Sequence, residues 1–148
     1  DIIVTLDGNI YVADQSNHRI QKWTTDGTYL GWIGNGHTEG WVIGDSSSSG
    51  YLDGSFYYPC GLDIDINTGD IYIADTYNHR IQKWSSSGVY QGWIGKYHTT
   101  FMKGVENPPT SGNGLGEFYY PRDVAFDSLL KRVIICDTYN HRIQRFDY

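Results

Sequence analysis

The fold is decided by residues 70–95, which read DIYIADTYNHRIQKWSSSGVYQGWIG, because two related copies of this stretch occur in the chain. Residues 9–34 read NIYVADQSNHRIQKWTTDGTYLGWIG, and residues 132–148 read RVIICDTYNHRIQRFDY. The histidine of the shared run lies at positions 18, 79 and 141, which sets successive periods of 61 and 62 residues. Internal repetition on this scale indicates an architecture that stacks one supersecondary unit.

Each copy is predicted to contain short strands separated by tight turns. Apolar and polar residues alternate along the first strand, as in a strand with two different faces. Asp-Gly and Thr-Gly-Asp sequences supply the positive backbone angles that hairpins need. The expected strands are 62–66 and 124–126 (first), 71–74 (second), 80–84 (third), and 29–33 and 90–94 (fourth).

Four antiparallel strands joined by short turns form a sheet whose apolar faces stay exposed unless neighbouring copies cover them. Radial stacking of such sheets gives a β-propeller, usually with about four to eight blades. We therefore predict an all-β fold with about two and a half four-stranded blades. The expected boundaries are about 1–34, 54–95 and 116–148 for blades 1, 2 and 3 (the last incomplete), with inserts at about 35–53 and 96–115.

The repeated motif resembles the NHL repeat, which is named for an Asn-His-Leu or Asn-His-Arg run that follows an Ala-Asp pair. The stretches that carry the resemblance lie at 13–20, 74–81 and 136–143, preceded by the Gly-x-Phe-x-x-Pro lead-ins at 54–59 and 116–121. The resemblance implies a propeller that is usually six-bladed and a family with protein-binding, RNA-binding, sensor and a few enzymatic members. Two and a half repeats cannot close a ring, so we expect either flanking sequence or other chains to complete it.

Composition narrows the function classes. The net charge is -6 and the pI is about 5.1. Binding to phosphates usually requires a basic surface, so nucleic acid is disfavoured as a partner. No apolar stretch approaches the roughly 18 residues of a membrane-spanning helix, and no signal peptide is recognisable. Richness in Ser, Gly, Thr and Tyr favours an extracellular or cell-surface protein.

The two cysteines, Cys60 and Cys136, leave the redox state open. They lie far apart in the sequence and lack the spacing of a metal site. Both a disulfide and two free thiols fit the sequence.

The two inserts are predicted to emerge on the same face as the repeated motif. Loops on a rigid scaffold often carry function. The first insert is expected to expose Trp41, and the second offers Tyr97, Phe101, Met102 and the proline pair at 108–109. Aromatic residues among Ser, Gly and Asn are typical of a surface that binds a protein or a glycan. The alternative is that these aromatic side chains pack against neighbouring blades.

The polar residues of the motif are interpreted as scaffolding, because every blade needs the same turn whereas an active site needs asymmetry. The aspartates are expected to accept hydrogen bonds from the turn that follows. The arginines are expected to pair with carboxylates between blades. The residues concerned are Asp14, Asn17, His18 and Arg19, then Asp75, Asn78, His79 and Arg80, then Asp137, Asn140, His141 and Arg142.

His37 and His98 occupy equivalent positions, one blade apart, after each Trp-Ile-Gly sequence. Neutral imidazoles suit zinc or copper, so a metal site at this pair is one hypothesis. The default is that both histidines pack or form hydrogen bonds, and no cofactor is predicted. The carboxylates Asp63, Asp65 and Asp70 are not kept as a group in the third copy, so calcium is not predicted either.

Three functions fit these patterns. The favoured one is a non-catalytic scaffold that holds a protein or glycan on the face that carries the inserts and the repeated motif. The second is a structural subunit whose open blade edges are completed by copies of itself in a dimer or filament. The third, implied by the resemblance, is a propeller lyase or lactonase with its ligand in the central channel near Cys60 and Arg122. No nucleophile or phosphate-loop motif supports the third function.

Overall fold

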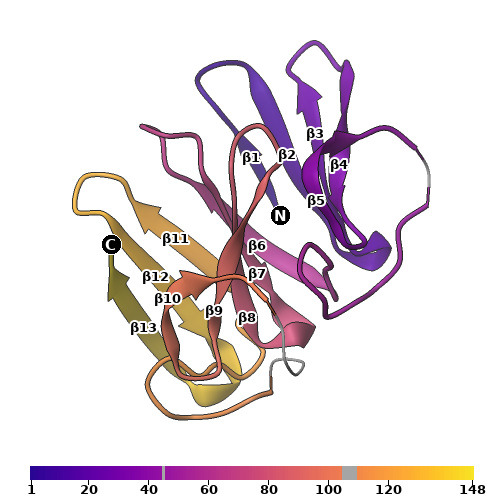
Figure 1. Cartoon of the computed structure of the whole chain (residues 1–148). Helices are drawn as coiled ribbons and strands as arrows, with labels where there is room; N and C mark the ends of the chain where they lie inside the picture. Colours follow the sequence, from indigo (N-terminus) through magenta and orange to yellow (C-terminus); the bar gives the residue numbers. More distant parts are fainter. Residues whose placement is uncertain (45, 105–109) are drawn as a thin grey trace.

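The computed structural model describes residues 1–44, 46–104 and 110–148, which form three antiparallel sheets arranged as successive blades (Figure 1). This arrangement confirms the all-β, propeller-type fold predicted from the repeats. Three-residue helical turns at Gln15–Asn17, Thr76–Asn78 and Thr138–Asn140 join the second and third strands of each sheet. Within the described ranges, no helix is long and apolar enough to span a membrane.

Each sheet follows the chain in simple up-and-down order. The first sheet consists of β1 (Ile2–Val4), β2 (Asn9–Asp14), β3 (Arg19–Thr24), β4 (Tyr29–Gly34) and β5 (His37–Val42). The second consists of β6 (Pro59–Ile64), β7 (Ile71–Asp75), β8 (Arg80–Trp84), β9 (Tyr90–Gly95) and β10 (His98–Met102). The third consists of β11 (Asp123–Asp127), β12 (Arg132–Asp137) and β13 (Arg142–Asp147).

The first two sheets have one strand more than the four predicted. The extra strands, β5 and β10, form the start of the two inserts that were expected to be loops. Each pairs irregularly with the preceding strand, with a break in register between its two aligned pairs. Glycines allow the close approach: a Cβ at Gly31 would lie 2.8 Å from the carbonyl oxygen of Val42, and one at Gly92 would lie 2.7 Å from that of Met102.

The core consists of two layers of side chains, one between each pair of neighbouring blades. Alternate residues of β7 point in opposite directions, so Ile71 and Ile73 pack toward blade 1 whereas Tyr72 and Ala74 pack toward blade 3. All four are almost fully buried. Both faces of blade 2 are therefore covered, as the stacking argument requires, and burial of each large apolar side chain contributes about 1.5 to 3 kcal/mol.

Candidate functional site

The Asp-x-x-Asn-His-Arg motif forms a hydrogen-bond network at the end of each second strand, and in blade 2 its Asp–Arg pair is fully buried. In blade 2 the carboxylate oxygen Oδ2 of Asp75 accepts bonds from Arg80 Nε at 2.7 Å, Gln82 Nε2 at 2.7 Å and Asn78 Nδ2 at 2.9 Å. The other oxygen, Oδ1, accepts the backbone N–H of Tyr57 at 2.7 Å. A single carboxylate thus fixes the turn, the next strand and the lead-in to its own blade.

The three side-chain donors recur around Asp14 and Asp137, and Asp137 also accepts the backbone N–H of Tyr119. The aspartates therefore accept bonds from the following turn, as the sequence suggests. The prediction that the arginines pair with carboxylates between blades is wrong. Each arginine pairs with the aspartate of its own motif, because antiparallel pairing of the second and third strands places the two side by side: Asp14 with Arg19, Asp75 with Arg80, and Asp137 with Arg142.

The rest of the arginine guanidinium binds the chain that returns from the preceding insert. Arg80 donates from Nη1 to the carbonyl oxygen of Tyr51 at 3.0 Å, and from Nη2 to those of Leu52 at 3.1 Å and Ser55 at 2.8 Å. Arg142 makes the equivalent bonds to carbonyl oxygens at positions 113, 114 and 117. The motif therefore braces the junction between insert and lead-in.

The motif histidines connect one blade to the next. Nδ1 of His18 accepts the backbone N–H of Tyr58 at 3.2 Å, and Nδ1 of His79 accepts that of Tyr120 at 3.1 Å. An accepting Nδ1 carries no proton, so the bond requires a neutral imidazole. Burial lowers the pKa of both histidines below the usual value, although nearby aspartates, Asp75 among them, oppose the shift.

These bonds hold the tyrosine backbones in the left-handed region, with φ of 51° at Tyr58 and 46° at Tyr120. Non-glycine residues rarely adopt this conformation unless their surroundings enforce it. The strain places two adjacent tyrosine rings on the surface at the start of blades 2 and 3.

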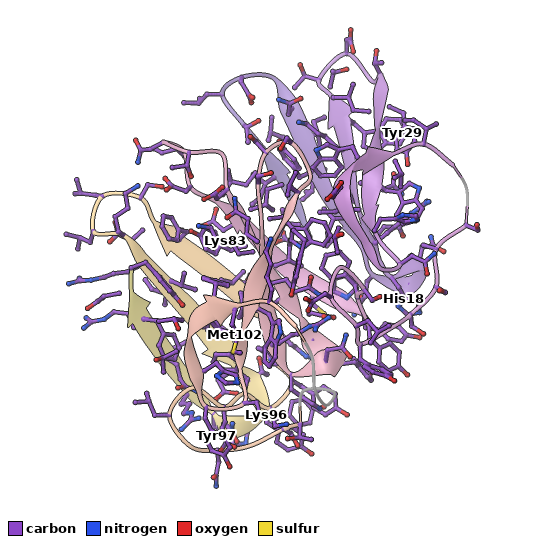
Figure 2. All side chains as sticks on the ribbon, in the orientation of Figure 1. His18, Tyr29, Lys83, Lys96, Tyr97 and Met102 are labelled. Atoms are coloured by element: carbon purple, nitrogen blue, oxygen red, sulfur yellow. The ribbon has the colours of Figure 1, made fainter. Side chains whose placement is uncertain are left out.

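Six tyrosines gather on this side of the molecule in a continuous series of ring contacts, which we call the tyrosine belt. Its members are Tyr57, Tyr58, Tyr77, Tyr119, Tyr120 and Tyr139. Tyr77 is central, because its ring centroid lies 5.2 Å from that of Tyr57, 4.8 Å from that of Tyr58 and 4.9 Å from that of Tyr120. His18 closes one end against Tyr58, and Figure 2 shows it beside the motif turn of blade 1.

The belt stays open to solvent although its rings touch. Tyr57, Tyr77, Tyr119 and Tyr139 are 38 to 50% exposed. The guanidinium of Arg122 lies 5.9 Å from the ring centroid of Tyr139. Sequence reasoning missed the belt, because its members come from two lead-ins and two motif turns. The available signal was the Tyr-Tyr pair in both lead-ins and the tyrosine two residues after the motif aspartate in blades 2 and 3.

The aromatic residues of the inserts lie differently from the prediction. Trp41 is not a free surface ring: it packs on Tyr11, with centroids 5.7 Å apart, and donates from Nε1 to the carbonyl oxygen of Ser86 in blade 2 at 3.0 Å. Phe101 packs on Tyr72 and Tyr148. The alternative that these rings pack against neighbouring blades therefore applies to both, because β5 and β10 carry them onto the next sheet.

The other predicted binding residues separate from one another. Tyr97 is 70% exposed and projects from the lower edge of the molecule in Figure 2, where a hydrogen bond to Glu117 raises its pKa. Met102 is half-buried on β10. His37 and His98 each form a T-shaped ring contact with a tryptophan of their own blade, at centroid distances of 5.6 and 5.5 Å. The proline pair at 108–109 lies outside the described residues.

Possible metal ligands are dispersed over residues 1–44, 46–104 and 110–148. No group of three or more His, Cys, Asp or Glu side chains comes together there. Cys60 and Cys136 are both free thiols.

A hollow of about 370 Å³ lies where the first strands of the blades converge. It is lined by Asp1, Ala13, Gln15, Cys60, Gly61, Arg122 and Asp123. Gln15 donates from Nε2 to the sulfur of Cys60 at 3.1 Å. Cys60 and Arg122 thus line one hollow together with the acidic residues Asp1 and Asp123.

The repeated braced turns and stacked antiparallel sheets define a β-propeller of repeat type. The NHL repeat model matches residues 2–23, 56–84 and 118–146, and the chain belongs to the NHL repeat family. It is 28% identical over 147 residues to the peptidyl-glycine alpha-amidating monooxygenase of Mus musculus and 27% identical to that of Rattus norvegicus. The match covers 97% of this chain but only 13% of either relative's length.

Solved structures share the fold. An auxiliary nutrient binding protein from Bacteroides thetaiotaomicron superposes with a TM-score of 0.68 at 16% identity, over 97% of this chain and 36% of that one. Its counterpart from Bacteroides ovatus gives 0.66 at 19% identity over the same shares. The similar proteins therefore include an enzyme and proteins named for binding.

Proposed function

We propose that this chain is a non-catalytic binding module that holds a protein or glycan partner on the tyrosine belt. The belt is the observation that supports this most strongly, because six tyrosines are held in mutual contact while four remain well exposed. Tyrosine is enriched in protein interfaces and among the residues that contribute most to affinity. Its ring provides apolar area and its hydroxyl a hydrogen bond.

The scaffold under the belt favours binding, because the belt is already ordered. The left-handed backbones of Tyr58 and Tyr120 are fixed by bonds from the preceding blade. The lead-ins are also bonded to the motif aspartates. A partner therefore has little side-chain and loop freedom to remove on binding, which is the usual cost of a flexible surface.

The test uses a substitution that is already present in blade 1 of the same chain. Blade 1 has Ser16 where blades 2 and 3 have Tyr77 and Tyr139, yet its turn has the same geometry. Ligands selected from a random peptide display library and from an array of neutral and acidic glycans should bind the wild-type chain at least about tenfold more tightly than a Tyr77→Ser/Tyr139→Ser variant. Tyr97→Ser, off the belt, is the control. Selected ligands that bind all three proteins equally would contradict the proposal.

A second candidate is assembly with further blades that are supplied by another copy of the chain. Ile20 and Ile81 are fully buried between blades, whereas the equivalent Ile143 is 62% exposed. It borders a shallow hollow with Cys136, Thr138, His141 and Arg142. Light scattering of this chain over a range of concentrations tests this candidate: self-association that Ile143→Glu abolishes supports it, and a concentration-independent monomer contradicts it. We also propose an extracellular or cell-surface location, on composition.

A further inference from the structure

Two pairs of tyrosines within the belt repeat the same close geometry. The ring centroids of Tyr57 and Tyr77 lie 5.2 Å apart at an interplanar angle of 54°, and those of Tyr119 and Tyr139 lie 5.4 Å apart at 55°. In each pair one ring comes from the lead-in and the other from the motif turn. All four rings are at least 38% exposed. Contact between two phenols is thus combined with access for a reagent.

We propose that the belt is a site of oxidative tyrosine coupling, in which Tyr57 is joined to Tyr77 and Tyr119 to Tyr139 by a carbon–carbon bond. The co-reactant is hydrogen peroxide acting through a heme peroxidase. Each phenol loses one electron and one proton, and the two tyrosyl radicals combine through the ring carbons next to the hydroxyls. Two hydrogens leave the protein, the peroxide takes up both electrons, and two molecules of water form.

Ring contact and exposure to the reagent together decide which tyrosines couple. A radical on Tyr77 has a second phenol in contact, so coupling inside the molecule is favoured over encounter with another chain by a large effective concentration. The contacts from Tyr58 to Tyr77 and from Tyr77 to Tyr120, at 4.8 and 4.9 Å, also allow an electron vacancy to move along the belt to a reactive pair. Exposed tyrosines outside the belt lack this advantage. Tyr51, 49% exposed, has no ring contact in the part of the chain that the structure describes.

The pair Tyr57 and Tyr77 in blade 2 is the strongest support for the proposal, because blade 2 packs between two other blades. Tyr57 and Tyr77 keep 39 and 44% exposure although both faces of the blade are covered. Their bond would link the lead-in to the motif turn at the point where Asp75 already joins them by a hydrogen bond. The coupling therefore adds a covalent brace at a junction that is already held by a hydrogen bond. It does not depend on the belt holding a partner.

The experiment treats the whole chain, at several dilutions, with a heme peroxidase and hydrogen peroxide. Dityrosine is followed by fluorescence and located by mass spectrometry of tryptic peptides. Tyr57 and Tyr77 fall in one peptide, 23–80. Its mass should fall by that of two hydrogens, and it should not be joined to a second peptide. Tyr119 and Tyr139 fall in peptides 104–122 and 133–142, which should be joined.

Matched variants show whether coupling requires contact between two tyrosine rings or only exposure of a tyrosine to the reagent. Tyr77→Phe keeps the ring and removes the phenol, and should lower the internal product of peptide 23–80 by at least about tenfold. Tyr51→Phe, in the same peptide, should leave it unchanged. Product that is independent of dilution supports the proposal. It is overturned if dityrosine forms only between chains, if Tyr77→Phe leaves the product intact, or if Tyr51 and Tyr97 are the coupled residues.

Discussion

The motif turns and the insert strands β5 and β10 use their aromatic residues in opposite ways. The turns are short and repeated, yet they hold Tyr77 and Tyr139 in a solvent-exposed belt. The inserts are long and variable, yet Trp41 and Phe101 are packed on the next blade. Repetition therefore marks where a surface is held rigidly, and insertion marks where one blade is attached to another.

The difference follows from hydrogen bonding. In the turns the polar side chains satisfy one another and the backbone, so the aromatic residues between them are left to point outward. In the inserts the strands β5 and β10 pair with their own sheets at only two aligned positions each. Burial of an aromatic ring against the neighbouring blade supplies the attachment that this irregular pairing lacks.

The largest expected effect concerns the motif brace. Arg80 and Asp75 are fully buried, whereas Arg19 and Asp14 are 16 and 19% exposed. Arg80→Ala removes the cation that pairs with a buried carboxylate and the guanidinium that donates to three carbonyl oxygens, so it should lower the free energy of unfolding by about 3 to 5 kcal/mol. Arg19→Ala should cost about 1 kcal/mol or less. Urea denaturation of both variants measures the difference, and equal losses would show that burial does not set the strength of the brace.

How far the sequence predicts this molecule can be seen at His79 and Trp41. The run around His79 recurs at nearly equal spacing and with nearly the same residues, so the blades and their turns could be predicted directly. The strand around Trp41 could not, because Gly40 and the irregular register remove the alternation that marks a strand. The tyrosine belt was predictable only in part: the repeated tyrosines are visible in the sequence, but contact between Tyr77 and Tyr120 depends on how two blades stack.

The insert provides the second prediction. Trp41→Ala removes a ring contact with Tyr11, a contact with the ammonium of Lys22 and the bond to Ser86. The free energy of unfolding should fall by about 2 kcal/mol, in the range of a partly buried aromatic truncation. The measurement is again urea denaturation, with Tyr97→Ala as an exposed control in the other insert. If Trp41→Ala leaves stability unchanged, the first insert is a surface loop and the contrast between turns and inserts fails.

A third prediction concerns pH. His79 must be neutral to accept the N–H of Tyr120, and burial lowers its pKa in the folded chain. Its contribution is therefore fully present above the unfolded value of about 6.5, and is lost as pH falls through the lower folded pKa. His79→Asn keeps an acceptor and tolerates the left-handed backbone, but does not titrate.

Stability of the wild-type chain should fall more steeply between neutral and mildly acidic pH than that of His79→Asn, with His18 responsible for part of the slope that remains. The hydrogen bond itself contributes about 1 kcal/mol, so the effect of pH should be smaller than the effects of the first two substitutions. Denaturant midpoints at a series of pH values compare the two proteins. Parallel curves would mean that the blade-to-blade bond does not respond to protonation.

The smallest effect is expected at the centre of the belt. Tyr77→Ser should lower the free energy of unfolding by less than about 1 kcal/mol, because the ring is well exposed and the turn does not need it. Blade 1 shows this directly: Ser16 occupies the position, and His18 and His79 share a φ of 53°. A loss as large as that of Trp41→Ala would show that the belt stabilises the blades. A small loss would leave the six tyrosines without a structural reason to be there, and their exposure would then be explained by what they contact outside the chain.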